Sequence, residues 1–443
     1  MDLLRSEAVA IVRRLQEAGH QALFAGGCVR DQLLGEAPKD YDIATSALPT
    51  QVAELFPHCR AVGAHFGVMI VHRPEHDYEI ATFRTDLTYS DGRRPEQVAF
   101  STARDDAQRR DFTVNGIFFD PVRGEILDYV GGQKDLRGRV IRAIGDPGHR
   151  FLEDHLRLLR AVRLAAALDF TIEPATWAAI RLHAPSIRRI SQERVRDEFN
   201  RMLLHPSRLR AFDLLDSSGL LDEILPEFSA LRGCEQPPQF HPEGDVFVHT
   251  RLMLSLLPEK VSLPLALSVL LHDIGKPATF SVDPADGRIR FNSHDKTGAE
   301  MSEVILRRLR YPNHVIDAVV QAVRNHMGFK NVQDMRASRL KRLLAAPTFE
   351  DELELHRVDC LASNGMLDNH AFLLAKQAEF AAEPLIPPPL ITGRDLIALG
   401  WKPGPIFSEI LTAAQNQQLE GAFTDKEAAL DWVALTFGAP ENG

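Results

Sequence analysis

The chain has 443 residues, more than one hydrophobic core usually supports, so three or more modules are expected. Its hydrophobic content of 44% is typical of a soluble globular protein, and no apolar segment approaches the ~20 residues that span a bilayer, so no membrane partner is expected. The net charge of −10 would oppose nucleic-acid binding if it were evenly placed, which it is not. The four cysteines lack the paired spacing of a disulfide framework or zinc knuckle, and the start of the chain has no signal-like segment, so a reducing cytoplasm is the expected location.

Residues 1 to about 145 mix helical and strand patterns, which predicts an α/β head that opens with an amphipathic helix. Ala22–Phe24 has the composition of a strand, and Gly26-Gly27 follows as a turn before a helix over 28–34. Glycines let backbone N–H groups approach a phosphate, and a helix N-terminus favours an anion, so this turn is a candidate phosphate site. Further strands are expected at residues 67–71, 78–83 and 116–120.

Two carboxylates, Asp40 and Asp42, follow this turn. Because residues two apart on an extended strand point to the same face, both would project together and could hold Mg²⁺ beside a triphosphate. This arrangement suits metal-assisted nucleotidyl transfer. The alternative is a structural turn followed by an acidic, solvated loop.

Two further polar groups occur in the head. Glu79 could act as a third carboxylate near the metals, although a charge at the edge of a sheet is the favoured interpretation. Arg109, Arg110 and Asp111, with Asn115, could clamp triphosphate oxygens and hold ribose hydroxyls. A surface ion-pair cluster is the alternative.

From about Arg150 to Glu227 the apolar spacing becomes helical. Residues 137–210 contain fifteen arginines, no lysine and eight acidic residues, a local charge of +7 that leaves −17 elsewhere. Guanidinium groups donate in a plane, so this segment favours phosphate and base recognition over the alternative of solvated helix faces.

Asp154, Arg157, Arg160 and Arg163 succeed one another at one-turn spacing and would share one face of a helix. Asp154 offers acceptors where Arg157 offers donors, so the pair could meet the Watson–Crick edges of cytosine and adenine. Uracil and guanine present a carbonyl oxygen where the amino group should be, and the carboxylate would reject them. The alternative is an ordinary helical salt bridge between Asp154 and Arg157.

Residues 232–245 are rich in proline and are predicted to be a linker, and a second helical module follows to about residue 379. Within it, His249, His272-Asp273 and Asp359 can surround one divalent metal and leave positions open for water. His294 and His326 could extend this site to a second metal, or they could be ordinary surface or core histidines. Prolines over 384–389 precede a short tail.

Together, in this order, the motifs of residues 23–226 resemble the class II tRNA nucleotidyltransferase and poly(A) polymerase family of the DNA polymerase β superfamily. The resemblance implies that Asp40 and Asp42 are catalytic and bind Mg²⁺. It further implies a set of nucleotide-binding residues: Gly26, Gly27, Arg30, Asp31, Arg109, Arg110, Asp111, Asn115, Asp154, Arg157, Arg160 and Arg163.

Residues 247–361 resemble the HD phosphohydrolase superfamily, which implies a divalent metal of unknown identity at His249, His272, Asp273 and Asp359. Hydrolysis of a 2′,3′-cyclic phosphate, a 2′-phosphate or another phosphoester would suit repair of a damaged tRNA end. The implied fold class is α+β: a polymerase-β-like head, an all-α neck and body, an α-helical HD domain and a helical tail. The expected boundaries are 1–145, 146–231, 245–380 and 390–443.

Within this family, three segments favour a tRNA enzyme that adds CCA from CTP and ATP. Residues Arg84–Gln97, with Tyr89, Asp91, Arg93 and Arg94, resemble the flexible loop of enzymes that add the terminal A, and Val62–Gly67 resembles the tRNA enzymes more than the poly(A) polymerases. The tail segment from Ile391 is similar to a tRNA-contacting segment. An A-adding enzyme or poly(A) polymerase, a protein that is chiefly an HD phosphohydrolase, and an RNA-binding scaffold are the alternatives.

Overall fold

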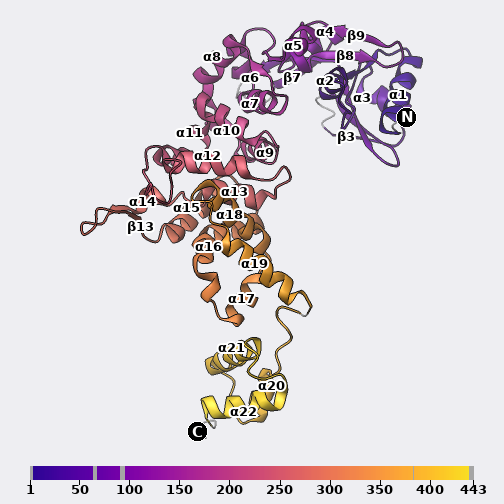
Figure 1. Cartoon of the computed structure of the whole chain (residues 1–443). Helices are drawn as coiled ribbons and strands as arrows, with labels where there is room; N and C mark the ends of the chain where they lie inside the picture. Colours follow the sequence, from indigo (N-terminus) through magenta and orange to yellow (C-terminus); the bar gives the residue numbers. More distant parts are fainter. Residues whose placement is uncertain (1–2, 63–66, 90–94, 383, 439–443) are drawn as a thin grey trace. The chain divides into compact units, whose positions relative to one another are not determined.

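The computed structural model describes residues 3–62, 67–89, 95–382 and 384–438 (Figure 1). The chain divides into two compact units, Met1–Ser229 with Arg308–Tyr311, and Ala230–Arg307 with Pro312–Gly443. The finer division into four domains stays a prediction. None of the described helices is both long and apolar enough to cross a membrane.

The first unit begins with a seven-stranded sheet in the order β3-β4-β5-β2-β1-β8-β9. β2 and β5 run parallel, and each of the other neighbouring pairs is antiparallel. The strands are β1 (Ala22–Ala25), β2 (Ile43–Thr45), β3 (Cys59–Ala61), β4 (Val68–His72), β5 (Asp77–Thr82), β8 (Ile117–Asp120) and β9 (Glu125–Asp128). The strands predicted near residues 22–24, 67–71, 78–83 and 116–120 are therefore confirmed, within one residue at each end.

Helices and a separate hairpin accompany this sheet. The helices are α1 (Leu3–Glu17), α2 (Gly27–Leu34), α3 (Pro49–Leu55), α4 (Ala103–Arg109) and α5 (Gly132–Gly138), and the hairpin pairs β6 (Arg84–Tyr89) with β7 (Pro95–Phe100). α1 buries Ala8, Ile11, Val12 and Leu15, the three-to-four-residue spacing of one helix face. All four residues of β1 are buried, so this interior strand lacks the alternation of a half-exposed strand.

The rest of the first unit is helical apart from one short strand pair. It contains α6 (Pro147–Glu153), α7 (Arg157–Ala167), α8 (Pro174–His183), α9 (Gln192–Leu203), α10 (Arg208–Ser218) and α11 (Leu220–Ile224). β10 (Val140–Ile141) and β11 (Thr171–Ile172) form a parallel pair that the helical pattern did not predict.

The second unit is also mainly helical. Its helices are α12 (Val246–Leu256), α13 (Leu263–Leu271), α14 (Lys276–Thr279), α15 (His294–Arg308), α16 (Asn313–Asn325), α17 (Ala337–Leu344), α18 (Phe349–Ala362), α19 (Asp368–Glu379), α20 (Gly393–Ala398), α21 (Pro405–Leu419) and α22 (Lys426–Phe437). An antiparallel hairpin of β12 (Phe280–Val282) and β13 (Ile289–Phe291) interrupts them and was not predicted. The last three helices share a cluster of buried apolar side chains that includes Leu396, Ile410 and Val433.

Candidate active sites

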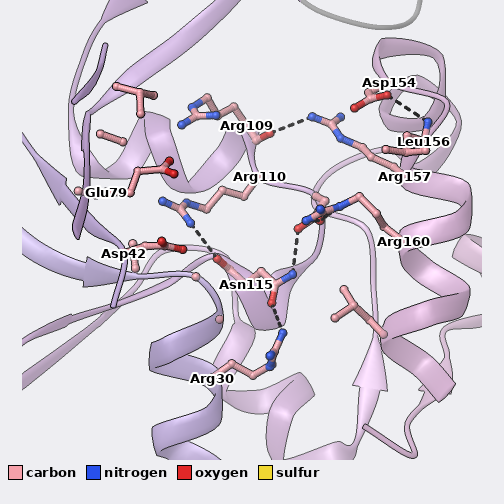
Figure 2. A pocket seen from close by; sticks show the side chains of 18 of the residues that line it. Arg30, Asp42, Glu79, Arg109, Arg110, Asn115, Asp154, Leu156, Arg157 and Arg160 are labelled. Atoms are coloured by element: carbon pink, nitrogen blue, oxygen red, sulfur yellow. Dashed lines mark hydrogen bonds and ion pairs between the residues drawn. The ribbon is translucent and has the colours of Figure 1, made fainter. Parts of the chain in front are cut away.

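A pocket of about 600 Å³ lies in the first unit, and most of the predicted nucleotide-binding residues line it (Figure 2). Those lining it are Gly26, Gly27, Arg30, Asp42, Arg109, Arg110, Asp111, Asn115, Asp154, Arg157, Arg160 and Arg163. Asp31 and Asp40 are not among the lining residues. Figure 2 shows Asp42 and Glu79 on one side, Asp154 and Arg157 on the other, and Arg110 reaching between them.

The glycine turn joins β1 to α2. Gly26 has φ +74°, and a Cβ there would lie 3.2 Å from Arg110 Nη1 and 3.8 Å from Asp42 Oδ2, so a side chain would enter the pocket. On α2, Arg30 Nη1 donates to Asn115 Oδ1 at 2.9 Å, and its Nη2 lies 2.6 Å from Asp31 Oδ1. Asp31 therefore holds Arg30 from outside the pocket.

The acidic pair lies just before β2 rather than within it, because the strand begins at Ile43. The expected alternation still holds: Tyr41 is 4% exposed, whereas Asp40 and Asp42 on either side of it are exposed. Only Asp42 lines the pocket.

Glu79 lies beside Asp42. β5 is an interior strand between β4 and β2, so the interpretation of Glu79 as a sheet-edge charge is wrong. The parallel register pairs Ile43 with Ile80, so Asp42, just before β2, lies beside Glu79 within β5. Although part of the Asp42 side chain is open to the pocket, desolvation by the surrounding protein, and then the charges of Asp40 and Glu79, raise its pKa to about 6, against the opposing effect of Arg110. A divalent cation would relieve this repulsion, and three carboxylates are the ligands it prefers.

Arg109 and Arg110 are fixed by Asp106, which the sequence analysis missed. Asp106 is 1% exposed; its Oδ1 accepts from Arg109 Nε at 2.8 Å and its Oδ2 from Arg110 Nη2 at 3.0 Å. Burial alone would raise the pKa of Asp106, but the two guanidiniums outweigh it and hold the pKa below its ordinary value. A surface ion-pair cluster is therefore wrong. The i, i+3 and i, i+4 spacing of the three residues was the available signal.

Asp111 is 8% exposed and acts as an internal anchor. It accepts from Arg160 Nε at 2.8 Å and Nη2 at 2.5 Å, and from Asn115 Nδ2 at 3.1 Å. Although burial opposes it, Arg160 holds the pKa of Asp111 well below its usual range. Asp111 thus positions Arg160 and Asn115 in the pocket.

Asp154 is not on a helix. α6 ends at Glu153 and α7 begins at Arg157, and between them Asp154 has extended backbone with φ −143° and ψ 105°. The prediction of one shared helix is therefore wrong, and the alternative of an ordinary helical pair does not apply. Asp154 Oδ2 pairs with Arg194 Nη2 at 3.1 Å, and Arg157 Nη1 donates to Glu153 Oε2 at 2.6 Å.

Two arginines of α7 and one of α9 complete this wall. Arg160 and Arg163 lie on α7 as predicted, and Arg163 Nε donates to Glu198 Oε2 at 2.5 Å. Arg194, on α9, also lines the pocket and was missed, because no local pattern links it to Asp154. Four arginines of the basic segment, Arg157, Arg160, Arg163 and Arg194, thus line the pocket, and their role in recognition stays a prediction.

Part of the segment predicted to be a flexible loop forms a hairpin. β6 and β7 form the ends of Arg84–Gln97, but Asp91, Arg93 and Arg94 lie outside the described residues. The same is true of 63–66, the middle of the Val62–Gly67 segment.

The four predicted metal ligands of the second unit come together from α12, the end of α13 and α18. His249 Nε2 lies 3.1 Å from Asp359 Oδ1 and 4.0 Å from Asp273 Oδ2, and His272 Nε2 lies 3.0 Å from Asp273 Oδ2. Among the described residues, His249 Nε2, His272 Nε2 and Asp273 Oδ2 are buried without a well-oriented hydrogen-bond partner. Such atoms are costly unless a cation satisfies them, so this donor set fits a divalent metal.

His294 and His326 face the other oxygen of Asp273. Their Nε2 atoms lie 3.6 and 3.8 Å from Asp273 Oδ1 and 3.1 Å from each other. Burial, and then the neighbouring His272, lower the pKa of His326 to about 4, so its ring is neutral. One carboxylate between two histidine pairs supports a second metal position.

The imidazole rings of His272, His294 and His326 are oriented by the same kind of backbone hydrogen bond. Nδ1 of His272, His294 and His326 lies 3.0, 2.7 and 2.6 Å from the backbone carbonyl oxygen three residues earlier. A carbonyl can only accept, so each Nδ1 carries the proton and each Nε2 presents a lone pair to the centre.

Residues 232–245, which were predicted to be a linker, supply side chains to this centre. Glu243 Oε1 lies 2.6 Å from His249 Nδ1 and 2.9 Å from His241 Nδ1. Gln236 Oε1 accepts from Lys276 Nζ at 2.6 Å, and the same Nζ lies 2.7 Å from Asp273 Oδ2. The sequence signal for this role was weak: His241 and Glu243 stand among prolines, where ligand-type side chains are uncommon.

Three protein-family models match the chain: "Poly A polymerase head domain" over residues 22–142, "Probable RNA and SrmB-binding site of polymerase A" over 169–231, and "HD domain" over 246–363. The first model includes the glycine turn, Asp42 and Arg110, and the third includes His249, His272, Asp273 and Asp359. The pocket residues Asp154, Arg157, Arg160 and Arg163 lie between the first and second models.

Two curated relatives differ in how much of the chain they match. The CCA-adding enzyme of Geobacillus stearothermophilus is 44% identical over 215 residues, 48% of this chain and 53% of the relative, so the chain spans about half the length of such relatives. The A-adding tRNA nucleotidyltransferase of Deinococcus radiodurans is 35% identical over 426 residues, 92% of this chain and 94% of the relative.

Solved structures agree with the fold. The Bacillus stearothermophilus CCA-adding enzyme in complex with CTP superposes with a TM-score of 0.74 at 28% identity and covers 98% of both chains. The Thermotoga maritima CCA-adding enzyme complexed with tRNA has a TM-score of 0.61 at 18% identity, over 99% of this chain and 96% of that one, and supports the fold alone. With a relative matched over nearly its whole length, this chain belongs to the class II tRNA nucleotidyltransferase and poly(A) polymerase family and carries an HD domain.

Proposed function

We propose that the chain builds or repairs the CCA end of tRNA, adding C from CTP and then A from ATP without a template. The observation that carries this proposal is a single pocket with a carboxylate cluster on one side, a carboxylate and guanidiniums on the other, and Arg110 between. A nucleotide also has two chemically different ends, the phosphates and the edge of the base, and each would meet one side of this pocket.

The phosphate end would lie between Arg110, Arg30 and the backbone N–H groups of the Gly26-Gly27 turn. Asp40 and Asp42, with Glu79, would hold Mg²⁺, which would activate the tRNA 3′-hydroxyl and neutralise the leaving diphosphate. The arginines bind and orient the triphosphate so that the hydroxyl attacks the α-phosphate in line.

The base end would meet Asp154 and Arg157. The Asp154 carboxylate accepts from the amino group that cytosine and adenine share, and Arg157 donates to the neighbouring ring nitrogen. Uracil and guanine would place a carbonyl oxygen against the carboxylate.

The test is single-nucleotide incorporation on tRNA transcripts that end at the discriminator base, at C and at CC, with CTP and ATP supplied separately. CCA addition predicts C on the first two transcripts and A on the third. A on the CC transcript alone would establish an A-adding enzyme, the alternative that the full-length relative favours. Long A tracts on any RNA would establish a poly(A) polymerase.

A second activity, hydrolysis of a phosphoester, is supported by the buried, unsatisfied donor atoms of the HD centre. His249, His272, Asp273 and Asp359 would hold a divalent metal, with His294 and His326 at a second position. Assays of 2′,3′-cyclic and 2′-phosphate ends with Mg²⁺, Mn²⁺, Co²⁺ or Ni²⁺ would identify the metal and substrate, and no hydrolysis with any of them would refute this activity.

Three further assignments go with this function. The four-domain division at 1–145, 146–231, 245–380 and 390–443 is the expected organisation, with tRNA contacted by the tail. A tRNA substrate also favours the cytoplasm as the place of action.

A further inference from the structure

The direction of the Asp154 side chain depends on Arg194. Arg194 Nη2 donates to Asp154 Oδ2 at 3.1 Å and approaches Oδ1 at 3.4 Å. Within the described part of the chain, the carboxylate's other hydrogen bond is from the Leu156 N–H, 3.1 Å from Oδ1. Asp154 lies in the break between α6 and α7, so no helix fixes its side chain. These two contacts therefore set where the carboxylate points.

Arg194 is built into the pocket rather than placed on a helix surface. Its side chain is 25% exposed and lines the pocket together with Asp154. Its Nη1 is buried and has no hydrogen-bond partner in the described part of the chain. Buried donors are nearly always satisfied, so an orphaned one in a pocket is typical of a group that completes its bonds with a ligand.

We propose that Arg194 determines nucleotide specificity by fixing the Asp154 carboxylate toward the amino group of cytosine or adenine. The inference rests on the proposed nucleotidyl transfer. A fixed carboxylate keeps its lone pairs opposite the carbonyl oxygen of uracil or guanine, and the repulsion rejects those bases. Without Arg194, the Asp154 carboxylate could rotate away from a carbonyl oxygen of uracil or guanine. The repulsion of the wrong base would then fall by more than the hydrogen bond to the amino group of cytosine or adenine weakens.

The test compares incorporation of all four nucleotides onto a tRNA transcript that ends at the discriminator base. We expect Arg194→Ala to lower the ratio of kcat/KM for CTP over UTP by about tenfold or more, the scale of one good polar contact to a base edge. Arg194→Lys should restore most of the ratio, because an ammonium can still pair with Asp154. The matched control is Arg188→Ala, whose side chain is 67% exposed and pairs with Glu223 outside the pocket; it should keep the wild-type ratio.

An equal loss for CTP and UTP, with the ratio unchanged, would overturn the role of Arg194. If circular dichroism shows that Arg194→Ala is unfolded, Arg194→Gln replaces it, and the same two outcomes decide. Wild-type protein that adds neither C nor A would refute the proposed function and this inference together, whereas normal addition with an unchanged ratio in the variants would refute only this inference.

Discussion

Asp106 illustrates how one buried carboxylate can organise a site that it does not face. Each of its oxygens holds a different arginine of the pocket, and the group is almost fully buried. Removing its charge would leave two guanidiniums free to change direction, and a misplacement of ~1 Å can cost on the order of 10²-fold in rate.

We therefore expect Asp106→Asn to lower kcat/KM for CTP on the order of 10²-fold. The free energy of unfolding should fall by about 3–5 kcal/mol, because one partner of buried ion pairs is lost. Steady-state kinetics and urea unfolding measure the two effects. Glu125→Gln, an exposed carboxylate of β9, is the control, and a change in stability without a change in kcat/KM would contradict the positioning role.

Asp42 gives a pH dependence with a defined sign. Its pKa of about 6 exceeds its value in an unfolded chain, about 4, so the folded protein binds this proton more tightly. In metal-free protein the stabilisation from that proton is complete below about pH 4 and is lost as the pH rises through 6.

The unfolding temperature without metal should therefore fall between about pH 4 and 6, and Glu79→Gln should reduce the fall by lowering the pKa of Asp42. Mg²⁺ affinity should rise over the same interval, because the cation competes with the proton. Differential scanning fluorimetry with EDTA or Mg²⁺ measures both. A profile that Glu79→Gln leaves unchanged would contradict the electrostatic link.

Single residues were predictable where chemistry is local. The i, i+2 spacing predicted that Asp40 and Asp42 project to one face, and Tyr41 between them is buried, but only Asp42 lines the pocket. Glu79 was misassigned because the interior position of β5 depends on strand order, and strand order depends on contacts between distant segments.

At the scale of elements, the break between α6 and α7 escaped prediction. The sequence between Glu153 and Arg157 contains no glycine or proline, so nothing local ends the helix. A tertiary contact accompanies the break: the Asp154 carboxylate pairs with Arg194, forty residues further along the chain. The break is where the proposed base-selecting residue lies.

The segment before α12 gives a prediction of its own. Glu243 holds the Nδ1 atom of His249, and a carboxylate in that position orients the ring and strengthens it as a ligand. Glu243→Gln should weaken metal binding to the HD centre by about 10–100-fold. Calorimetric titration of metal-free protein measures this, with exposed Glu235→Gln as the control. Equal affinities in the two variants would show that Glu243 does not act on the metal.

At the scale of the whole molecule, the two centres use entirely different residues, from different compact units. Their chemistry should therefore be separable. Asp42→Asn should abolish nucleotide addition and leave phosphoester hydrolysis at the wild-type rate, whereas His272→Ala should do the reverse. Both activities are measured on one preparation of each variant. Loss of both in a variant that remains folded would contradict independent centres.

The mainly helical character of residues 246–379 was predictable because helical periodicity persists over long segments. The proline-rich stretches 232–245 and 384–389 both lie within the second compact unit, so the division they predicted stays a prediction. The family fold was also expected, since its motifs occur in order. Among the strands that escaped are β3, β10, β11, β12 and β13, each two or three residues long. Strands so short carry too little periodicity to be distinguished from loops.

The parallel, in-register pairing of β2 with β5 has a consequence for how this protein tolerates change. Backbone pairing sets the separation of Asp42 and Glu79, so apolar substitutions along these strands should be accommodated readily. Adding or deleting one amino acid within β5 is different, because Glu79 would then swing to the opposite surface of the sheet. Insertions and deletions within β5 should therefore abolish the activity of the head more often than single substitutions do.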